Sequence, residues 1–232
     1  MISRRQLLLT AASALLLPRA VIASSGVADK LSWPAFQQQM NQLAENRLLT
    51  RLAQQEIVER GMQSLKQLDI HSPTFKEAVE MSYESGNRYW LWQRLMKSRN
   101  INGGILNISS EQLVQLHDHP GATGMVRVIS GEVEAWQFDE AGGNASHASP
   151  GTAELIRYSH RILKPGDMAV LTPEKGNIHA LRSLTKESRM LDFFIPPYQR
   201  SERHWFEPLA DNWFEQEVVS CRKISQQDFA DA

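Results

Sequence analysis

The spacing of hydrophobic positions divides the chain into two parts. In residues 28–98, apolar side chains recur every three or four positions, which is the spacing of one face of an α-helix. The first helix is expected to begin near Ser32, a capping residue, which is followed by Pro34 in the first helical turn. The core-facing stripes of the four predicted helical segments are Phe36, Met40 and Leu43; Leu49, Leu52, Ile57, Leu65 and Leu68 around Gly61; Phe75 and Val79 after Ser72-Pro73; and Tyr89, Trp92 and Met96.

From Asn102 onward the pattern changes to short runs typical of β-strands. The main runs are residues 105–108, 125–129, 132–136, 169–171 and 190–195. Ser130-Gly131 and the segment from Lys164 to Asp167 are turn signals between them. Residues 139–153 are rich in glycine, alanine and serine and predict a mobile hairpin loop. Many short strands at such spacing predict a β-sandwich or barrel.

Composition and charge narrow the class of protein. The 232 residues, 42% hydrophobic and 22% charged, suit one sizeable domain with a helical extension. With 25 basic and 26 acidic residues the formal charge is -1. The chain therefore lacks the excess of basic residues that would indicate nucleic-acid binding. The single cysteine, Cys221, excludes an internal disulfide framework and a Cys-rich zinc site, and we expect it to be buried.

The first residues have the order of an export signal. The basic pair Arg4-Arg5 precedes an apolar stretch, Leu7 to Leu17, and small residues ending at Ala23. The stretch is shorter than the roughly 20 residues that span a bilayer, so cleavage rather than anchoring is expected. The arginine pair before Leu7-Leu8 indicates the twin-arginine export machinery as a partner and a periplasmic or otherwise exported bacterial protein. We therefore expect a signal at residues 1–23, a helical region at 24–98 and a barrel domain at 99–232.

Three of the seven histidines carry the candidate chemistry. On a strand, the side chains of His117 and His119 would emerge on one face about 6.5–7 Å apart. Two imidazoles at that spacing can share a metal, with ligand bonds of roughly 2 Å. His179 follows a second turn-rich segment, and a barrel could place its strand beside the first. Alone, such a pair is weak evidence of a metal site, because a hydrogen-bonded surface or core pair is the commoner case. Asp118 would lie on the opposite face of the strand and act on the turn rather than on the metal.

Three segments in order carry a family resemblance: Leu116 to Gly131, Gly176 to His179, and Leu191 to Tyr198. They resemble the cupin superfamily and, within it, the cysteamine dioxygenase and plant cysteine oxidase family of thiol dioxygenases. The resemblance implies a mainly β fold, a cupin double-stranded β-helix barrel preceded by the α-helical region. It also implies Fe(II) held by His117, His119 and His179, with O2 converting a small-molecule or peptide thiol into a sulfinate.

One departure from other cupins favours thiol chemistry. Many cupins carry a glutamate shortly after the first two histidines, whereas no acid precedes Glu132 here. Three neutral imidazoles leave the full double charge on the metal, which favours an anionic, soft thiolate as a further ligand. The missing glutamate therefore argues against manganese oxalate-type chemistry.

The resemblance also assigns residues around the metal. Asp192 matches the family's acidic residue on a late strand; it could orient a ligand histidine or hold the substrate amine, or it could be a solvated strand end. A carboxylate in an apolar run is costly unless it is paired, which favours a role. Tyr198 matches a tyrosine near the family's pocket; the alternative is that it only packs at the rim of the barrel. Gly176 and Asn177 are expected to shape the turn before His179.

Other residues set limits on the resemblance. Some members carry a cysteine and a tyrosine shortly after the segment that matches Tyr198, but Ser201 to Phe206 stand here, so no such crosslink can form. His204 is a possible pocket residue, or else a packed or exposed one. We assign no role to the remaining histidines, which are His71, His147 and His160.

The first hypothesis is an exported mononuclear non-haem iron thiol dioxygenase. Because the family members used for comparison act in the cytosol on cysteamine or on N-terminal cysteine, an exported protein needs another thiol supply. The first alternative is a non-catalytic metal- or ligand-binding cupin. The second is another three-histidine cupin enzyme acting on a non-thiol substrate, such as a quercetinase-like dioxygenase or a metal-dependent isomerase.

Overall fold

The computed structural model describes residues 30–84, 88–89, 91–142 and 151–230. The predicted export signal at residues 1–23 lies outside these ranges, as do His147 and most of the predicted loop at 139–153. In the described part of the chain, none of the helices combines the length and apolar character that crossing a membrane requires.

Three helices precede the barrel, as expected: α1 (Trp33–Thr50), α2 (Gln54–Gln67) and α3 (Pro73–Glu84). The predicted stripes of α1 and α2 are buried at Phe36, Met40 and Ile57. The prediction that Leu49 belongs to the buried stripe of the second helix is wrong, because Leu49 belongs to α1 and is 81% exposed. The second helix starts later than expected because Arg51 adopts a left-handed backbone with φ 50° and ends α1.

The fourth predicted helix is wrong, because this segment forms the strands β1 (Arg88–Tyr89) and β2 (Trp92–Lys97). A register shift between Arg94 and Met96 adds one residue to β2 opposite β3. The buried residues Gln93 and Met96 therefore lie three positions apart instead of two. The predicted helical stripe of Tyr89, Trp92 and Met96 is not one face, because Tyr89 stands opposite Trp92 on the neighbouring strand and the register shift lies between Trp92 and Met96.

The rest of the chain is mainly β, which confirms the predicted fold class. The strands are β3 (Asn102–Ser109), β4 (Leu113–His117), β5 (Thr123–Ser130), β6 (Val133–Glu140), β7 (Thr152–Leu163), β8 (Met168–Leu171), β9 (Ile178–Ser183), β10 (Glu187–Ile195), β11 (His204–Pro208) and β12 (Val218–Ser225). Short helices η2 (Arg200–Glu202), η3 (Trp213–Glu215) and α4 (Gln226–Ala230) lie among the last strands. All five predicted runs lie on strands, and β6 pairs with β7 as a hairpin requires.

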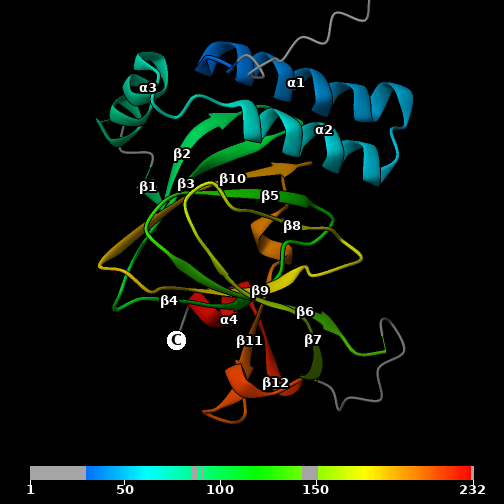
Figure 1. The fold of residues 1–232 in the computed structure, drawn as a ribbon. Helices are drawn as coiled ribbons and strands as arrows, with labels where there is room; N and C mark the ends of the chain where they lie inside the picture. The colour runs from blue at the N-terminus through cyan, green and yellow to red at the C-terminus, as the bar shows by residue number, and fades with distance from the viewer. Residues whose placement is uncertain (1–29, 85–87, 90, 143–150, 231–232) are drawn as a thin grey trace, which may run out of the picture.

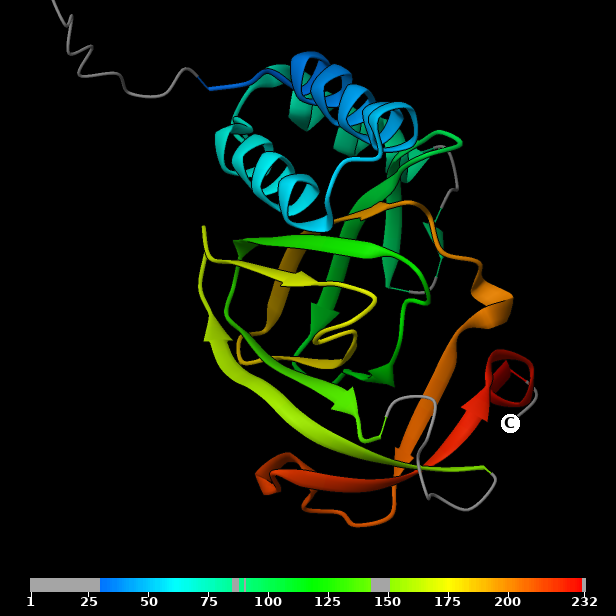
Figure 2. The same ribbon diagram turned by 90° about the vertical axis from the view of Figure 1, so that its right-hand side faces the viewer.

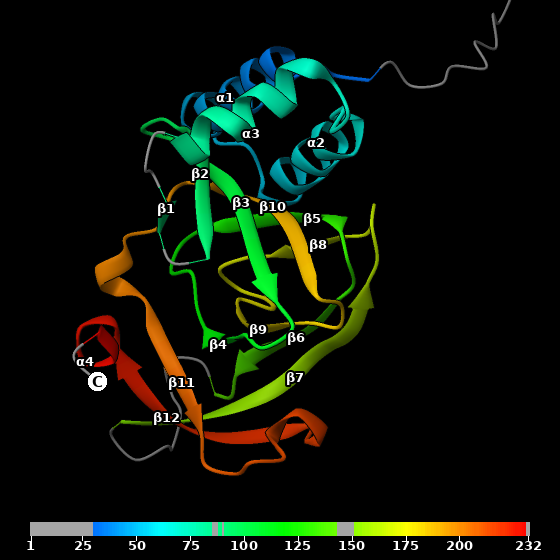
Figure 3. The same cartoon turned by 90° about the vertical axis from the view of Figure 1, so that its left-hand side faces the viewer.

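The strands form two antiparallel sheets. One has the order β1-β2-β3-β10-β5-β8, and the other closes in the order β11-β12-β7-β6-β9-β4. Figure 1 shows α1, α2 and α3 as a layer over the outer face of the first sheet, with β11 and β12 at the opposite end of the molecule. The two turned views show the same layering (Figures 2 and 3). The barrel interior is apolar at one end, where Val128, Val133 and Met190 pack together.

The helical layer is attached to the barrel by steric fit and by hydrogen bonds. Gly61 of α2 leaves room for Met125 of β5, since a Cβ there would lie 2.2 Å from the Met125 sulfur. Beside it, Arg127 Nη1 donates to the carbonyl oxygens of Leu65 (2.9 Å) and Leu68 (3.0 Å). These carbonyls lie at the end of α2, where a cation also stabilises the helix dipole. The first sheet is thereby covered on its outer side.

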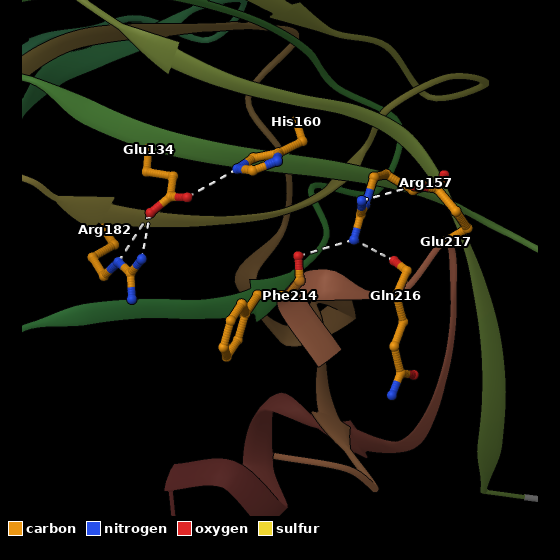
Figure 4. Close-up of polar contacts among 7 residues, drawn as sticks. All are labelled: Glu134, Arg157, His160, Arg182, Phe214, Gln216 and Glu217. Atoms are coloured by element: carbon orange, nitrogen blue, oxygen red, sulfur yellow. Dashed lines mark hydrogen bonds and ion pairs between the residues drawn. The ribbon is translucent and has the colours of Figure 1, made fainter. Parts of the chain in front are cut away.

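Polar contacts join strands of the second sheet to one another and to the segment that contains η3 (Figure 4). His160 stacks on the Trp136 ring and donates to Glu134 (2.9 Å), which also accepts from Arg182. Arg157 donates to Glu217 and to backbone carbonyls of the segment that contains η3, and so holds that segment against β7. Cys221 lies in the core enclosed there and is fully buried, as expected.

Candidate metal centre

The site begins with one cross-strand pair. His117, the last residue of β4, stands directly opposite His179, the second residue of β9. Directly opposite residues of antiparallel strands point to the same face, so both rings enter the barrel, with ring centroids 4.5 Å apart. The expectation that a barrel brings these two distant residues together is confirmed.

His119 reaches the same place by a different route. It was expected to lie on the strand with His117, but β4 ends at His117 and the chain turns at Gly121, which has φ 69°. The side chain of Asn177 holds the turn: its Oδ1 accepts from the His119 amide (2.7 Å) and its Nδ2 donates to the His119 carbonyl (3.3 Å). Asn177, expected only to shape its own turn, therefore positions a histidine on the neighbouring segment.

The three imidazoles form a compact group. Their potential ligand nitrogens all lie within 4.8 Å of one another, and all three residues are buried. Nδ1 of His117 donates to the Gln115 carbonyl (2.7 Å) and Nδ1 of His179 to the Asn177 carbonyl (3.3 Å). Each bond fixes the tautomer that leaves Nε2 with a free lone pair. Nδ1 of His119 is buried without a hydrogen-bond partner in the described part of the chain.

Electrostatics keeps these rings neutral. Burial lowers the pKa of His117 and His119 well below the usual value, and the neighbouring histidines and Arg203 lower it further. Burial lowers the pKa of His179 to about 4. A neutral imidazole is the form that binds a metal, because ligation needs the lone pair that protonation removes. The three residues therefore fit a divalent metal ion.

Asp192 lies on β10, in the sheet opposite the histidines. It is nearly buried between its partners Gly104 and Val126, and the Trp92 indole donates to its Oδ1. Burial raises its pKa to about 7, although the Trp92 hydrogen bond opposes this shift. In the described part of the chain no ligand histidine is its hydrogen-bond partner, so it does not orient the metal ligands.

A glycine makes the contact between Trp92 and Asp192 possible. A Cβ on Gly104 would lie 2.4 Å from the Trp92 ring and 2.4 Å from the Gln93 carbonyl. The indole therefore occupies the space above Gly104 that any side chain would fill. Trp92 was missed as a site residue because its position was interpreted as part of a helix.

Tyr198 and Arg203 form another wall. The Tyr198 ring lies 4.5 Å from the His119 ring, and Arg203 donates to the Tyr198 hydroxyl. The Arg203 guanidinium also lies over the Tyr198 ring, at 4.9 Å, and the Trp205 ring, at 5.4 Å. Arg203 was missed because it reaches the cavity through tertiary contacts with Tyr198 and Trp205, which the sequence does not reveal.

These residues surround a cavity of about 80 Å³ that contains the histidine face. Its polar members besides the histidines are Trp92, Asn102, Asp192, Tyr198 and Arg203. The Asn102 Oδ1 is buried without a hydrogen-bond partner in the described residues. Asn102 and Asp192 lie on the paired strands β3 and β10, two positions apart in register, and so share a face. The cavity thus has hydrogen-bond acceptors opposite the metal ligands.

Asp118 and His204 lie outside this cavity. Asp118 accepts from the His204 amide (2.7 Å) and from the His204 ring Nδ1 (3.1 Å). The pair joins the end of β4 to the start of β11, which agrees with the expectation that Asp118 acts on the backbone rather than on the metal. His204 is a partly exposed residue of this pair and does not line the cavity.

Comparisons with known proteins find a matching family model, similar sequences and similar folds. The PCO_ADO family model matches residues 59–222. The 2-aminoethanethiol dioxygenases of Mus musculus and Homo sapiens are 25% and 27% identical over 124 and 126 residues. These matches cover 46% of this chain, and the chain spans about half the length of the curated relatives, 48% and 47%. A Klebsiella pneumoniae protein with a double-stranded β-helix domain is 19% identical, covering 45% of this chain and 75% of that one, with a TM-score of 0.34.

Replacing any one of the three histidines by alanine should abolish metal retention. Each ring supplies one of three neutral donors, and two donors hold a divalent ion far more weakly. Metal content after purification measures retention, and far-UV circular dichroism should show an intact fold. Exposed His71 replaced by alanine is the matched control. Normal metal content in any of the three variants would contradict the ligand assignment.

Asp192→Asn should change how stability depends on pH. A pKa raised from 3.8 to about 7 means that the folded state keeps a proton that the unfolded state has lost, so stability decreases as pH rises through this window. Without metal, the free energy of unfolding of the variant should rise relative to that of the parent by a few kcal/mol between pH 4 and pH 8.

Urea unfolding at several pH values measures this difference. The three histidines have the opposite dependence, because their lowered pKa values favour folding as pH rises, but they are common to both proteins and cancel in the comparison. A difference that does not change with pH would show that Asp192 is ionised throughout.

Proposed function

The chain belongs to the PCO_ADO family, and from this premise we propose that it is a mononuclear non-haem iron enzyme that oxidises a small or N-terminal cysteine-type thiol to a sulfinate. The observation that carries the proposal is the group of three buried, neutral histidines, with no carboxylate among the converging ligand atoms of the described residues. The named activity of the mouse and human relatives supports the same class of reaction.

The iron would be held by His117, His119 and His179. When bound, it would supply coordination positions for a thiolate and O2, and its uncompensated double charge would favour the thiolate. The net reaction adds both atoms of O2 to the substrate sulfur. Sulfur loses four electrons and O2 gains four, so no further reductant is required, and the product is a sulfinate.

The chain's own residues would select and orient the substrate. Asp192 and Asn102 present acceptors on one wall, and the cation they suit best is a substrate ammonium group. Trp92 keeps the Asp192 carboxyl in place through its hydrogen bond. Arg203 holds the Tyr198 hydroxyl beside His119 and adds positive charge, which favours the thiolate over the thiol. These contacts support an aminothiol as the substrate.

The iron-loaded protein should consume O2 and form sulfinate with cysteamine, cysteine or a peptide that begins with cysteine. Asp192→Asn should retain iron but lower kcat/KM for these aminothiols by about 10- to 100-fold, the value of a lost charged hydrogen bond. 2-Mercaptoethanol, which lacks the amine, should be much less affected. Asp211→Asn, on the exposed surface, is the matched control.

Two other results would each favour an alternative function. Full occupancy by zinc or nickel in protein from its native compartment, without thiol turnover, would favour a non-catalytic metal-binding cupin. Oxygenation or isomerisation of a non-thiol compound would favour another three-histidine cupin enzyme. An unchanged rate in Asp192→Asn would remove Asp192 from substrate recognition.

We also propose that the protein is exported through the twin-arginine pathway and acts outside the bacterial cytoplasm. The support is the sequence of residues 1–23, with Arg4-Arg5 before an apolar stretch and small residues near Ala23. The thiol would then be one present in the periplasm or beyond.

Replacing both Arg4 and Arg5 by lysine should leave the uncleaved chain in the cytoplasm. The charge of the segment is unchanged by this substitution, so only recognition of the arginine pair is lost. Cell fractionation and the mass of the mature protein measure the outcome. Lys30→Arg, beyond the expected cleavage point, is the control, and normal export of the double variant would contradict twin-arginine recognition.

A further inference from the structure

A second, smaller cavity of about 30 Å³ also has His179 in its wall. It is situated where the edge strand β8 of the first sheet meets β6 and β9 of the second. Gln137 Nε2 bridges this seam by donating to the Val170 carbonyl at 2.8 Å. The apolar residues around the cavity include Ala135, Leu163, Ala169, Leu171, Leu181 and Met190.

The lining of this seam cavity suits an apolar molecule better than water. A buried water needs roughly 2–4 hydrogen bonds. Of the two polar residues that line the cavity, Gln137 uses its amide nitrogen on the carbonyls of Val170 and Gly176, and His179 uses Nδ1 on the Asn177 carbonyl. A volume of 30 Å³ exceeds the roughly 10–15 Å³ that one water-sized particle occupies. A small apolar gas therefore meets both the size and the polarity of the cavity.

The seam cavity adjoins the metal cavity. Five residues line both: Val126, Leu171, His179, Leu181 and Met190. Apart from His179 these shared walls are aliphatic or thioether side chains, which exchange rotamers without breaking hydrogen bonds. By contrast, Asn102, Asp192 and Arg203 line only the larger cavity. The metal centre is thus approached from a polar side and from an apolar side.

We propose that the seam cavity is a binding site for O2, from which the gas reaches the centre beside His179 while the thiol occupies the polar cavity. This inference rests on the proposed dioxygenase function. A separate apolar site allows O2 to be held without displacing the amine and thiol groups from their polar contacts. Ala169 and Val170, at the half-buried edge of β8, lie at the outer end of this site.

Xenon tests the site without metal, thiol or turnover, because it occupies dry apolar cavities of this kind. Crystals of the full chain under xenon pressure should show xenon between Ala169 and His179. Ala169→Val should remove that density, because the added methyl groups fill the space. Ala135→Val fills the opposite wall and serves as the second variant in case the first fails to fold.

In the iron-loaded enzyme the same substitutions should raise the KM for O2 several-fold and leave the KM for the thiol and the iron content unchanged. Ala153→Val is the control, because Ala153 is a buried alanine that packs instead in the core around Trp136 and Phe138. It should leave both xenon binding and the KM for O2 as in the parent.

Two outcomes overturn this inference: no xenon in the seam cavity of the parent protein, or an unchanged KM for O2 in folded Ala169→Val and Ala135→Val. An absence of thiol-dependent O2 uptake in the parent is a different failure, because it overturns the proposed function. The xenon measurement, which requires no turnover, separates the two.

Discussion

The antiparallel pairing of β4 with β9 is the constraint on which the site depends. It places His117 opposite His179, although the two residues are far apart in the sequence. Asn177, two residues before His179, then holds the backbone of His119. A slip of the register by one residue would turn one ring out of the barrel and move this amide away from its partner. All three donors therefore depend on a single strand alignment.

Burial in the barrel interior determines the protonation of the residues on both walls of the site. Burial keeps the imidazoles deprotonated and holds a proton on Asp192 up to about pH 7, so the same low polarity favours the neutral form on both walls. Arg203 adds a positive group beside both. The helical layer covers the outer face of the first sheet and so maintains this environment.

Sequence alone predicts the elements whose evidence is local. The histidine pair, the turn before His179 and the alternating strands could all be recognised from neighbouring residues. The helix expected around Trp92 could not be corrected in this way, because only strand pairing shows that Tyr89 and Trp92 lie opposite each other on β1 and β2. For the same reason Trp92, Asn102 and Arg203 were not candidates: each reaches the cavity through tertiary contacts. Asn177 was noticed, but its true partner lies 58 residues away.

The position of Cys221 has a practical consequence for an enzyme proposed to act on sulfur. It is the only cysteine of the chain, it has no exposed surface, and burial raises its pKa to about 12. At neutral pH it is a protonated thiol in the core formed by strands of the second sheet, and nucleophilic sulfur chemistry requires the thiolate. The folded catalyst is therefore protected from modifying itself, and thiol-reactive dyes added to its reaction mixtures report the substrate without a background from the protein.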